Sequence, residues 1–339
     1  MTLPETRSIS VVVPTFNDVG RLGEALTSIV GQTLPPGEVV VADDGSDDGT
    51  DEFVAEFSAG QANGVAVRYV RLSSRSGVVA ARNEGIALAH GEWIATCDSD
   101  DVWAPSKLER QAAFVRDWRG GQPIALLGTY GYNVNDAKRV ISIADMGPTS
   151  EEEYSALRRA GGTFFMLHSS VMYPRADYLA VGGYTTEYRA ADDVHFFCQM
   201  AERGVVISLP EPLVYYRKRA GSVQMSRFWD QRRGVLRLTE NQQRRAAGEA
   251  PIGSDEFDAQ MASDPALKRL RRRRQLWGVY YYRVGAAHIV NGRRLRGGLE
   301  LALASVMDGA RLRSGIRHVL RVRPSRASRA LPAAEREAP

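Results

Sequence analysis

Polar residues follow three short apolar runs in the first hundred residues, and their types could support chemistry. The three polar stretches are Pro14-Thr15-Phe16-Asn17, Asp43-Asp44-Gly45-Ser46 and Asp98-Ser99-Asp100-Asp101. Each stretch alone could be ordinary turn or helix-capping chemistry, because Asp, Asn, Gly and Ser populate turns and caps. Together they hold five carboxylates, and gathering so much charge is costly unless a cation or hydrogen-bond donors offset it. The combination therefore favours a functional site over three unrelated turns.

Alternating apolar runs and amphipathic stretches must position these residues. We expect strands over residues 9–13, 39–42, 65–70 and 93–97, and helices over residues 22–30, 51–57 and 78–89. Such alternation predicts an α/β fold in which helices flank a mostly parallel sheet. In sheets of this kind ligands bind beyond the carboxyl ends of the strands. We therefore expect the three polar stretches to converge on one crevice.

The composition is that of a globular protein. The chain has 339 residues, of which 44% are hydrophobic and 25% charged, enough for one large domain with an appendage or for two domains. No apolar run approaches the roughly eighteen residues that cross a bilayer, and the first eight residues lack the layout of a secretory signal. Cys97 and Cys198 are far apart without a partner motif, which argues against a disulfide framework or zinc site. A cytoplasmic location is the resulting expectation.

Several short motifs occur in a fixed order between residues 8 and 222. They are Val-Val-Val-Pro-Thr-Phe-Asn at 11–17, Ser-Ile-Val-Gly-Gln-Thr at 28–33, Val-Val-Val-Ala-Asp-Asp-Gly-Ser-Asp-Asp-Gly-Thr at 39–50, Ala-Arg-Asn-Glu-Gly at 81–85, Gly-Glu-Trp-Ile at 91–94, Asp-Ser-Asp-Asp at 98–101, Gly-Gly-Tyr at 182–184, Asp-Asp at 192–193 and Pro-Leu-Val-Tyr-Tyr-Arg at 212–217. In order and spacing the set resembles the inverting family-2 glycosyltransferases of the GT-A fold. The resemblance implies a Rossmann-like, mostly parallel central sheet flanked by helices, with a C-terminal helical extension here.

The resemblance also implies a nucleotide-sugar site. Its expected residues are Pro14, Thr15, Asn17, Asp43, Asp44, Arg82, Asp98, Ser99 and Arg219. Thr15 and Asp43 would hold the nucleotide base, since a carboxylate accepts a hydrogen bond from a uracil or thymine imide. Asp98 would reach the ribose. Arg82 would contact the donor, with an ion pair that anchors its helix as the alternative.

A divalent cation is the expected cofactor. By the resemblance, Asp100 and Asp98 would bind Mg²⁺ or Mn²⁺, which bridges the donor diphosphate. Such hard cations prefer oxygen ligands, and they offset the charge that develops on the departing nucleoside diphosphate.

By the resemblance, the general base is expected at the second acid of a Glu-Asp or Asp-Asp pair that opens a helix. That position is Asp193, which would take the proton of the acceptor hydroxyl. Helix capping is the alternative, and it could be the whole role of Asp192. Asp192 and His168 are assigned to the acceptor side, although a buried histidine satisfied by its neighbours is the alternative for His168.

One position departs from the resemblance. Many relatives have a metal-binding His two residues after the Tyr-Arg motif, whereas this chain has Arg219 there. A guanidinium does not ligate a metal, but it pairs with phosphate. The hypothesis is that Arg219 binds the donor diphosphate, and a solvated loop arginine is the alternative.

The predicted function is metal-assisted, inverting transfer of a sugar from a UDP- or dTDP-linked donor in cell-envelope or polysaccharide biosynthesis. The acceptor could be a glycan, a lipid-linked intermediate or a small molecule. A sugar nucleotidylyltransferase and a non-catalytic sugar-nucleotide-binding protein are the alternatives. The first is disfavoured because no Gly-rich phosphate loop follows the first strand. An oxidoreductase is disfavoured because no Gly-x-Gly-x-x-Gly motif follows a strand.

The end of the chain is strongly basic. Residues 268–339 carry a net charge of +14, whereas residues 1–267 carry −10. We expect a catalytic domain over residues 1–225, a basic helical extension over 226–323 with helices at 267–288, 295–307 and 310–321, and a disordered tail over 324–339. Its apolar stripe would pack on the catalytic domain, or its arginines would contact an anionic membrane peripherally at the inner face. Nucleic acid is not expected as a partner, because no recognition motif is present.

Overall fold

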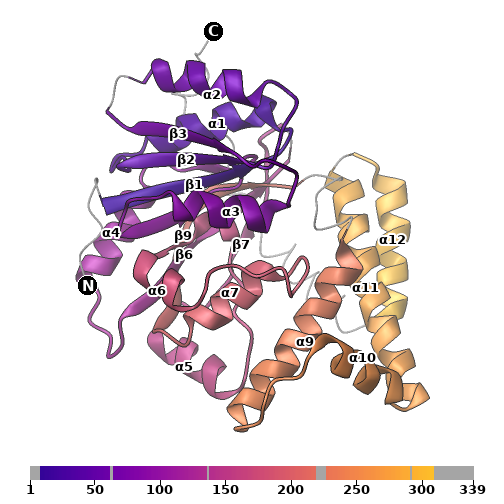
Figure 1. Cartoon of the computed structure of the whole chain (residues 1–339). Coiled ribbons are helices and arrows are strands. Elements are labelled where there is room, and N and C mark those ends of the chain that lie inside the picture. The colour runs from indigo at the N-terminus through magenta and orange to yellow at the C-terminus, as the bar shows by residue number, and fades with distance from the viewer. Residues whose placement is uncertain (1–7, 62–63, 136, 219–226, 291, 309–339) are drawn as a thin grey trace. The chain divides into compact units, whose positions relative to one another are not determined.

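The computed structural model describes residues 8–61, 64–135, 137–218, 227–290 and 292–308 (Figure 1). The chain divides into two compact units. The first comprises Met1–Tyr132 and Ala144–Tyr216, and the second comprises Asn133–Ile143 and Arg217–Pro339. Among the described helices, none is both long and apolar enough to span a membrane.

The first unit is built on a sheet with the strand order β3-β2-β1-β4-β8-β6-β9-β5. The strands are β1 (Ile9–Thr15), β2 (Glu38–Asp43), β3 (Ala66–Arg71), β4 (Trp93–Thr96), β5 (Val102–Trp103), β6 (Ile124–Val134), β8 (Met172–Pro174) and β9 (Val205–Arg217). Strands β3, β2, β1 and β4 run parallel, and the β4–β8, β6–β8 and β5–β9 pairs are antiparallel. The predicted α/β fold with a parallel strand core is confirmed.

Helices connect and cover these strands. They are α1 (Val19–Val30), α2 (Thr50–Ala59), α3 (Val78–Ala87), α4 (Lys107–Asp117), α5 (Glu151–Arg159), α6 (Arg175–Ala180) and α7 (Asp192–Met200), with a short 3₁₀ turn at His168–Ser170. Helix α3 lies very close to β1 and β2, because a Cβ atom at Gly85 would fall 2.6 Å from Cγ1 of Val12. Because Gly85 has no side chain, α3 can pack directly on the sheet, and this packing positions Arg82 of the same helix.

The strand ends converge as the sequence predicts. Every residue of β1 and β2 is buried, as expected for β-branched strands of a parallel sheet covered on both faces. Thr15 and Asp43 are paired in register at the last position of their strands. The backbone N–H of Asp44 donates to the carbonyl of Thr15 at 3.0 Å, and that of Cys97 donates to the carbonyl of Val12 at 3.2 Å. All three polar stretches thus begin at one edge of the sheet.

At the opposite edge of the sheet, the buried carboxylate of Glu38 links several strands by hydrogen bonds. Oε1 of Glu38 accepts hydrogen bonds from Ser10 Oγ and the His90 N–H, both at 2.6 Å, and Oε2 accepts one from Arg68 at 3.1 Å. Desolvation raises the pKa of Glu38, but these hydrogen bonds outweigh it and leave the pKa below its ordinary value. Glu38 therefore links β1, β2, β3 and the turn before β4 as a carboxylate.

Replacing Glu38 with glutamine is expected to lower the free energy of unfolding by about 1–3 kcal/mol at pH 7, because the charged hydrogen bonds are lost. A lowered folded-state pKa gives stability that is present above the unfolded pKa and lost as the pH falls through the folded value. The difference between wild type and Glu38→Gln should therefore shrink below about pH 4. Urea unfolding between pH 3.5 and 7 measures it. Glu56→Gln, at an exposed position of α2, is the control and should change little. A pH-independent difference would contradict the prediction.

The second unit is mainly helical. The end of β6 and β7 (Val140–Ala144) form a hairpin in which the Asn135 N–H donates to the Arg139 carbonyl. The helices are α9 (Phe228–Ala246), α10 (Ser254–Ser263), α11 (Ala266–Val290) and α12 (Arg294–Met307). The helices expected at 267–288 and 295–307 are thus present. The helix expected at 310–321 and the tail at 324–339 lie outside the described residues, as does the proposed boundary at residue 225, which remains a prediction.

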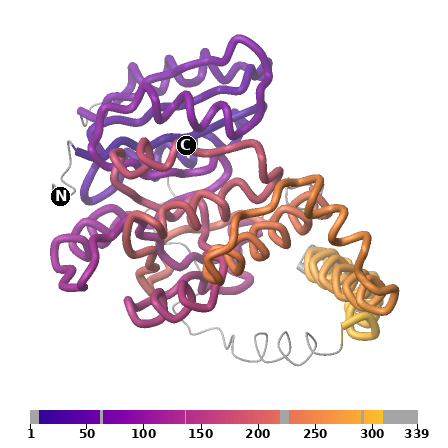
Figure 2. The backbone as a smooth tube through the Cα atoms, turned by 60° about the horizontal axis from the view of Figure 1, so that its bottom comes forward, coloured from indigo at the N-terminus to yellow at the C-terminus, as the bar shows by residue number. Residues whose placement is uncertain are grey.

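Helix α11 packs within this unit through aromatic rings and glycines. Trp277 and Tyr280 of α11 lie 4.8 and 5.3 Å, between ring centroids, from Trp229 and Phe228 of α9. Helices α11 and α12 lie side by side (Figure 2). Within the predicted stripe, Trp277 contacts α9 and His288 contacts Glu300 of α12, whereas Leu267 and Leu270 are exposed. Packing of the stripe on the catalytic domain remains a prediction.

Candidate functional site

Two buried side chains end neighbouring strands at the predicted base-binding position. Oγ1 of Thr15, the last residue of β1, is buried and has no hydrogen-bond partner among the described residues. Asp43, the last residue of β2, accepts hydrogen bonds from the Ser46 hydroxyl and the Tyr69 hydroxyl, both at 2.5 Å. The carboxylate of Asp43 is therefore held rigidly beside a hydroxyl that still lacks a partner.

Asn17 joins the loops that follow β1 and β2. Its φ of +48° lies in the left-handed region, which Asn adopts more readily than most residues. Its N–H donates to Ser46 Oγ and its Oδ1 accepts from the Asp47 N–H, both at 2.9 Å. Pro14 lies within β1, fully buried. Of these two predicted site residues, Asn17 therefore shapes the loop, whereas Pro14 belongs to the buried strand.

Asp44 holds the segment that precedes α3. Its Oδ1 accepts from the Ser76 N–H at 2.6 Å, and both of its oxygens lie 2.9 Å from the Gly77 nitrogen. The structure thus commits this carboxylate to backbone donors, a positioning task that the sequence did not reveal.

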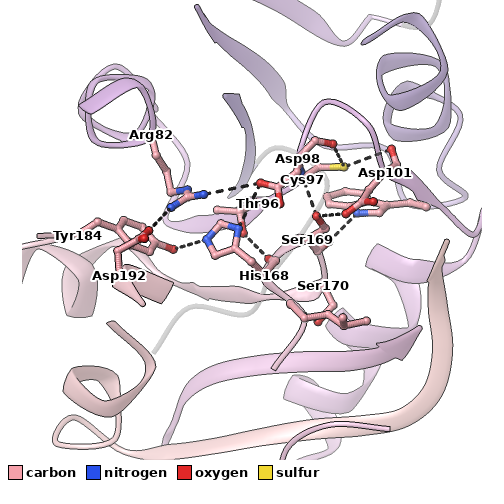
Figure 3. Close-up of polar contacts among 12 residues, drawn as sticks. Arg82, Thr96, Cys97, Asp98, Asp101, His168, Ser169, Ser170, Tyr184 and Asp192 are labelled. Carbon is pink, nitrogen blue, oxygen red and sulfur yellow. Dashed lines mark hydrogen bonds and ion pairs between the residues drawn. The ribbon is translucent and has the colours of Figure 1, made fainter. Parts of the chain in front are cut away.

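The turn after β4 is fixed by side chains from other segments (Figure 3). Asp98 donates its N–H to Ser169 Oγ at 3.1 Å, and the Ser169 hydroxyl donates to the buried carboxylate of Asp101 at 2.5 Å. Ser99 donates its hydroxyl to Asp18 at 2.9 Å. Asp100 is partly exposed on the same turn. Ser169 therefore sets the conformation of the Asp98–Asp101 turn.

His168 lies against Asp98. Its Nδ1 is 3.6 Å from Oδ1 of Asp98, and its Nε2 is 3.0 Å from the Tyr184 hydroxyl (Figure 3). Burial and the nearby charge of Arg82 lower the pKa of His168, so the imidazole is neutral near pH 7. A neutral ring with its proton on Nδ1 accepts a hydrogen bond from Tyr184 and turns N–H toward Asp98. The structure therefore places His168, which the sequence assigned to the acceptor side, beside the donor-side carboxylate of Asp98, although Nδ1 makes no hydrogen bond within the described residues.

Arg82 connects two distant parts of the chain. Its buried guanidinium donates to Asp192 at 3.0 Å, lies 3.7 Å from Asp98 and sits 4.8 Å over the ring of Tyr184 (Figure 3). Desolvation raises the pKa of Asp98, but His168 and then Arg82 outweigh it and hold the pKa at about 2. The ion pair that the sequence analysis weighed as an alternative for Arg82 is thus present.

Asp193 lies next to Asp192, the ion-pair partner of Arg82, in the first turn of α7. Its Oδ1 accepts from the N–H of Val194 at 2.8 Å. Desolvation, reinforced by the negative charge of Asp192, raises the pKa of Asp193 to about 7. A carboxylate with this pKa can accept a proton near neutral pH more readily than an ordinary aspartate.

The carboxylates of the turn fit a hard cation. The described part of the chain contains no group of three or more His, Cys, Asp or Glu side chains that could hold a metal alone. Asp98 and Asp100 offer oxygen atoms only, and Mg²⁺ commonly takes one or two carboxylates while water and substrate phosphates fill its other positions. The donor set therefore fits a cation that a diphosphate helps to bind. Arg219 lies outside the described residues.

Lys107 is buried against Trp103 and Gln111, two residues that hydrogen-bond to the Ser169–Ser170 segment of the site. The sequence did not predict this position. Nζ of Lys107 donates to Gln111 Oε1 at 2.9 Å and lies 3.8 Å over the ring of Trp103. Burial lowers the pKa of Lys107 to about 7. Trp103 Nε1 and Gln111 Nε2 donate to the carbonyls of Ser169 and Ser170 at 2.7 and 2.9 Å. A lysine at the start of a helix normally suggests an exposed position, so only the structure identifies this role.

Known proteins share a sequence family and a fold with this chain. The family described as glycosyl transferase family 2 matches residues 10–179. An uncharacterized glycosyltransferase of Haemophilus influenzae is 28% identical over 223 residues, which are 64% of this chain and 78% of the relative.

Among the solved structures that share the fold are two glycosyltransferase complexes. S. aureus TarS 1–349 in complex with UDP-GlcNAc has a TM-score of 0.56 at 20% identity, covering 91% of this chain and 92% of TarS 1–349. The mannosyltransferase PcManGT from Pyrobaculum calidifontis, in complex with GDP-Man and Mn²⁺, has a TM-score of 0.54 at 18% identity, covering 92% of this chain and 84% of the other.

Proposed function

The chain belongs to glycosyl transferase family 2, and from this we propose that it transfers a sugar, with inversion, from a UDP- or dTDP-linked donor to a hydroxyl acceptor. One observation carries the proposal. Arg82 contacts both Asp98, on the turn after β4, and Asp192, the neighbour of Asp193. The expected donor-side and acceptor-side carboxylates therefore belong to one cluster.

Donor binding is proposed at the carboxyl ends of β1, β2 and β4. The buried, unpartnered hydroxyl of Thr15 and the fixed carboxylate of Asp43 support base recognition there. Asp98, whose pKa of about 2 keeps it ionised, would accept hydrogen bonds from the ribose hydroxyls. The complex of TarS 1–349 with UDP-GlcNAc supports a nucleotide-sugar donor. Arg219 would pair with the donor diphosphate.

The proposed chemistry is a single displacement. The acceptor oxygen forms a bond to the anomeric carbon while the bond from that carbon to the diphosphate oxygen breaks, and Asp193 takes the hydroxyl proton. The nucleoside diphosphate leaves from the opposite face, which inverts the configuration. Desolvation of Asp193 supports this role, because it raises the basicity of the carboxylate. His168 and Arg82 act as positioning residues for Asp98 and Asp192.

Asp100 and Asp98 are the residues that would hold Mg²⁺ or Mn²⁺. When bound, the cation would offset negative charge on the leaving diphosphate. The oxygen-only donor set and the Mn²⁺ in the mannosyltransferase complex support this assignment. Membership of a glycosyltransferase family favours this function over a nucleotidylyltransferase.

A panel of UDP-, dTDP- and GDP-sugars tests the donor and the metal together. With Mn²⁺, wild type should release nucleoside diphosphate from one donor class, and EDTA should stop the release. Asp100→Asn should reduce the rate at least about a hundredfold. The control is Asp117→Asn, at an exposed aspartate that pairs with Arg116 at the end of α4, and it should retain the wild-type rate.

The outcomes separate the parts of the proposal. Full activity in EDTA would exclude the metal while leaving the donor intact. Release from a GDP-sugar alone would contradict the base assignment. Failure of every donor to raise the melting temperature, with or without Mn²⁺, would contradict nucleotide-sugar binding itself.

A further inference from the structure

Helix α12 of the second unit exposes a continuous apolar face. Leu295, Leu299, Leu303 and Val306 have exposed fractions of 90%, 70%, 44% and 69%. They follow one another at intervals of four, four and three residues, which places them on one face of a helix. We call these four residues the α12 stripe. Ordinary solvated helices present polar residues on such a face.

Packing against α11 fixes the direction in which the stripe faces. A Cβ atom at Gly297 would lie 2.7 Å from the Gly285 carbonyl oxygen, so the two helices touch through their backbones. His288 of α11 and Glu300 of α12 form a hydrogen bond of 2.5 Å beside this contact. Gly285, Gly297, Leu301 and the polar pair line this contact, and none of them belongs to the α12 stripe. The stripe is left for another partner.

The charge around the stripe is strongly positive. Helices α11 and α12, with the segment that joins them and Asp308, contain ten basic residues and two acidic ones. The basic residues are Lys268, Arg269, Arg271, Arg272, Arg273, Arg274, Arg283, Arg293, Arg294 and Arg296. Of the two acids, Glu300 already interacts with His288 and Arg296.

Basic residues lie at both ends of the stripe. Arg293, Arg294 and Arg296 surround Leu295 in the sequence. At the other end, Arg274 donates to the carbonyl of Val306 at 3.0 Å, which brings the basic start of α11 to the end of α12. An exposed apolar face combined with nearby arginines is one feature of helices that lie in a membrane interface.

We propose that the α12 stripe inserts into the interface of an anionic phospholipid bilayer while the flanking arginines contact lipid phosphates. Charge complementarity selects this partner. A second copy would bring ten basic residues against ten, and residues 309–339 of this chain are themselves basic, with eight arginines against two glutamates. Nucleic acid would match the charge but would not cover the leucines. The inference is independent of the proposed donor and acceptor.

Co-sedimentation of the full chain with vesicles tests the proposal. Wild type should bind phosphatidylcholine vesicles that contain 30% phosphatidylglycerol at low salt, and bind pure phosphatidylcholine weakly. The triple variant Leu295→Gln/Leu299→Gln/Leu303→Gln should reduce the partition coefficient at least about tenfold. The triple variant Arg271→Gln/Arg293→Gln/Arg294→Gln should reduce it about a hundredfold, at about fivefold for each arginine. Leu179→Gln is the matched control, since Leu179 of the first unit is 56% exposed.

All substituted positions are exposed, and equal melting temperatures would show that the variants fold. Three results would each overturn the proposal. Wild type could fail to sediment with anionic vesicles at low salt. The leucine variant could bind as wild type does, which would reduce the interaction to charge alone. Finally, wild type could self-associate without lipid in a way that the leucine variant abolishes, which would make a second copy the partner.

Discussion

Asp193→Asn is expected to lose nucleoside diphosphate release by about a thousandfold in kcat, because asparagine keeps the shape of the side chain but does not accept a proton. Donor affinity should be unchanged, since the proposed donor contacts come from other segments. Initial rates with the donor found in the panel, together with a donor titration, measure both quantities. A variant that retains more than a tenth of the wild-type rate would exclude Asp193 as the base.

The pH dependence of the reaction rate is an independent test of Asp193 as the general base. A general base must be deprotonated, and burial raises the pKa of Asp193 to about 7. The wild-type rate should therefore rise about tenfold per pH unit below pH 7 and level off above it. Asp192→Asn removes a negative charge that raises this pKa, so the bend should move to lower pH. A profile that is flat down to pH 5 would contradict the assignment.

Stability provides the control for Asp193→Asn. A carboxyl group whose folded-state pKa lies above its unfolded value contributes stability at low pH that is lost as the pH rises toward the folded value. At pH 8 the ionised Asp193 therefore opposes folding, and Asp193→Asn should melt no lower than wild type. A lost activity with an undiminished melting temperature would separate chemistry from misfolding.

Arg82→Gln is expected to lower the free energy of unfolding by about 3 kcal/mol, because it removes a buried cation from two partly buried carboxylates. Asp192 and Asp98 both depend on this guanidinium. Urea unfolding at pH 7 measures the loss. The exposed Arg119, which donates to the carbonyls of Arg116 and Trp118, provides the control variant Arg119→Gln, and it should change stability by less than about 0.5 kcal/mol.

A double-mutant cycle distinguishes the ion pair from simple packing. If Arg82 acts through Asp192, the variant Arg82→Gln/Asp192→Asn should lose less than the sum of the two single variants. Removal of Arg82 should also raise the pKa of Asp193, because its positive charge lowers that pKa. The bend in the pH–rate profile should then move to higher pH, opposite to the effect of Asp192→Asn. Additive losses would show that the pair contributes little.

The parallel core of the sheet could be predicted from the sequence, and the antiparallel strands could not. The strands β1, β2 and β4 are short, largely apolar runs, β3 is a β-branched and aromatic run, and helical segments separate them, so the alternation is easy to recognise. In β9, Pro210 and Pro212 interrupt the run, and proline argues against an interior strand because it lacks the N–H for the ladder. Strand β5 has only two residues and exists through its pairing with β9.

For the candidate site, the sequence indicated which residues gather but not what each one touches. Asp43 and Asp98 follow apolar runs, so their position at the sheet edge follows from topology alone. The pairing of Arg82 with Asp192 spans 110 positions of the chain, and no local pattern encodes it. The same holds for Asp44, whose partners at Ser76 and Gly77 are backbone groups of any residue type. The raised pKa of Asp193 depends on burial, which the tertiary structure alone determines.

The buried amine of Lys107 can serve as a chemical reporter of local opening beside the candidate site. The chain has four lysines, and Lys138, Lys218 and Lys268 are exposed, whereas Lys107 is fully buried beneath the Asp98–Asp101 turn. An amine-reactive reagent modifies only accessible, uncharged amines, and a pKa of about 7 leaves much of Lys107 uncharged near neutrality. Its reaction rate is therefore limited by how often the β5–α4 segment opens. The native chain thus carries one slow lysine among three fast ones, and the reaction of that slow lysine reports local opening beside the candidate site without any introduced label.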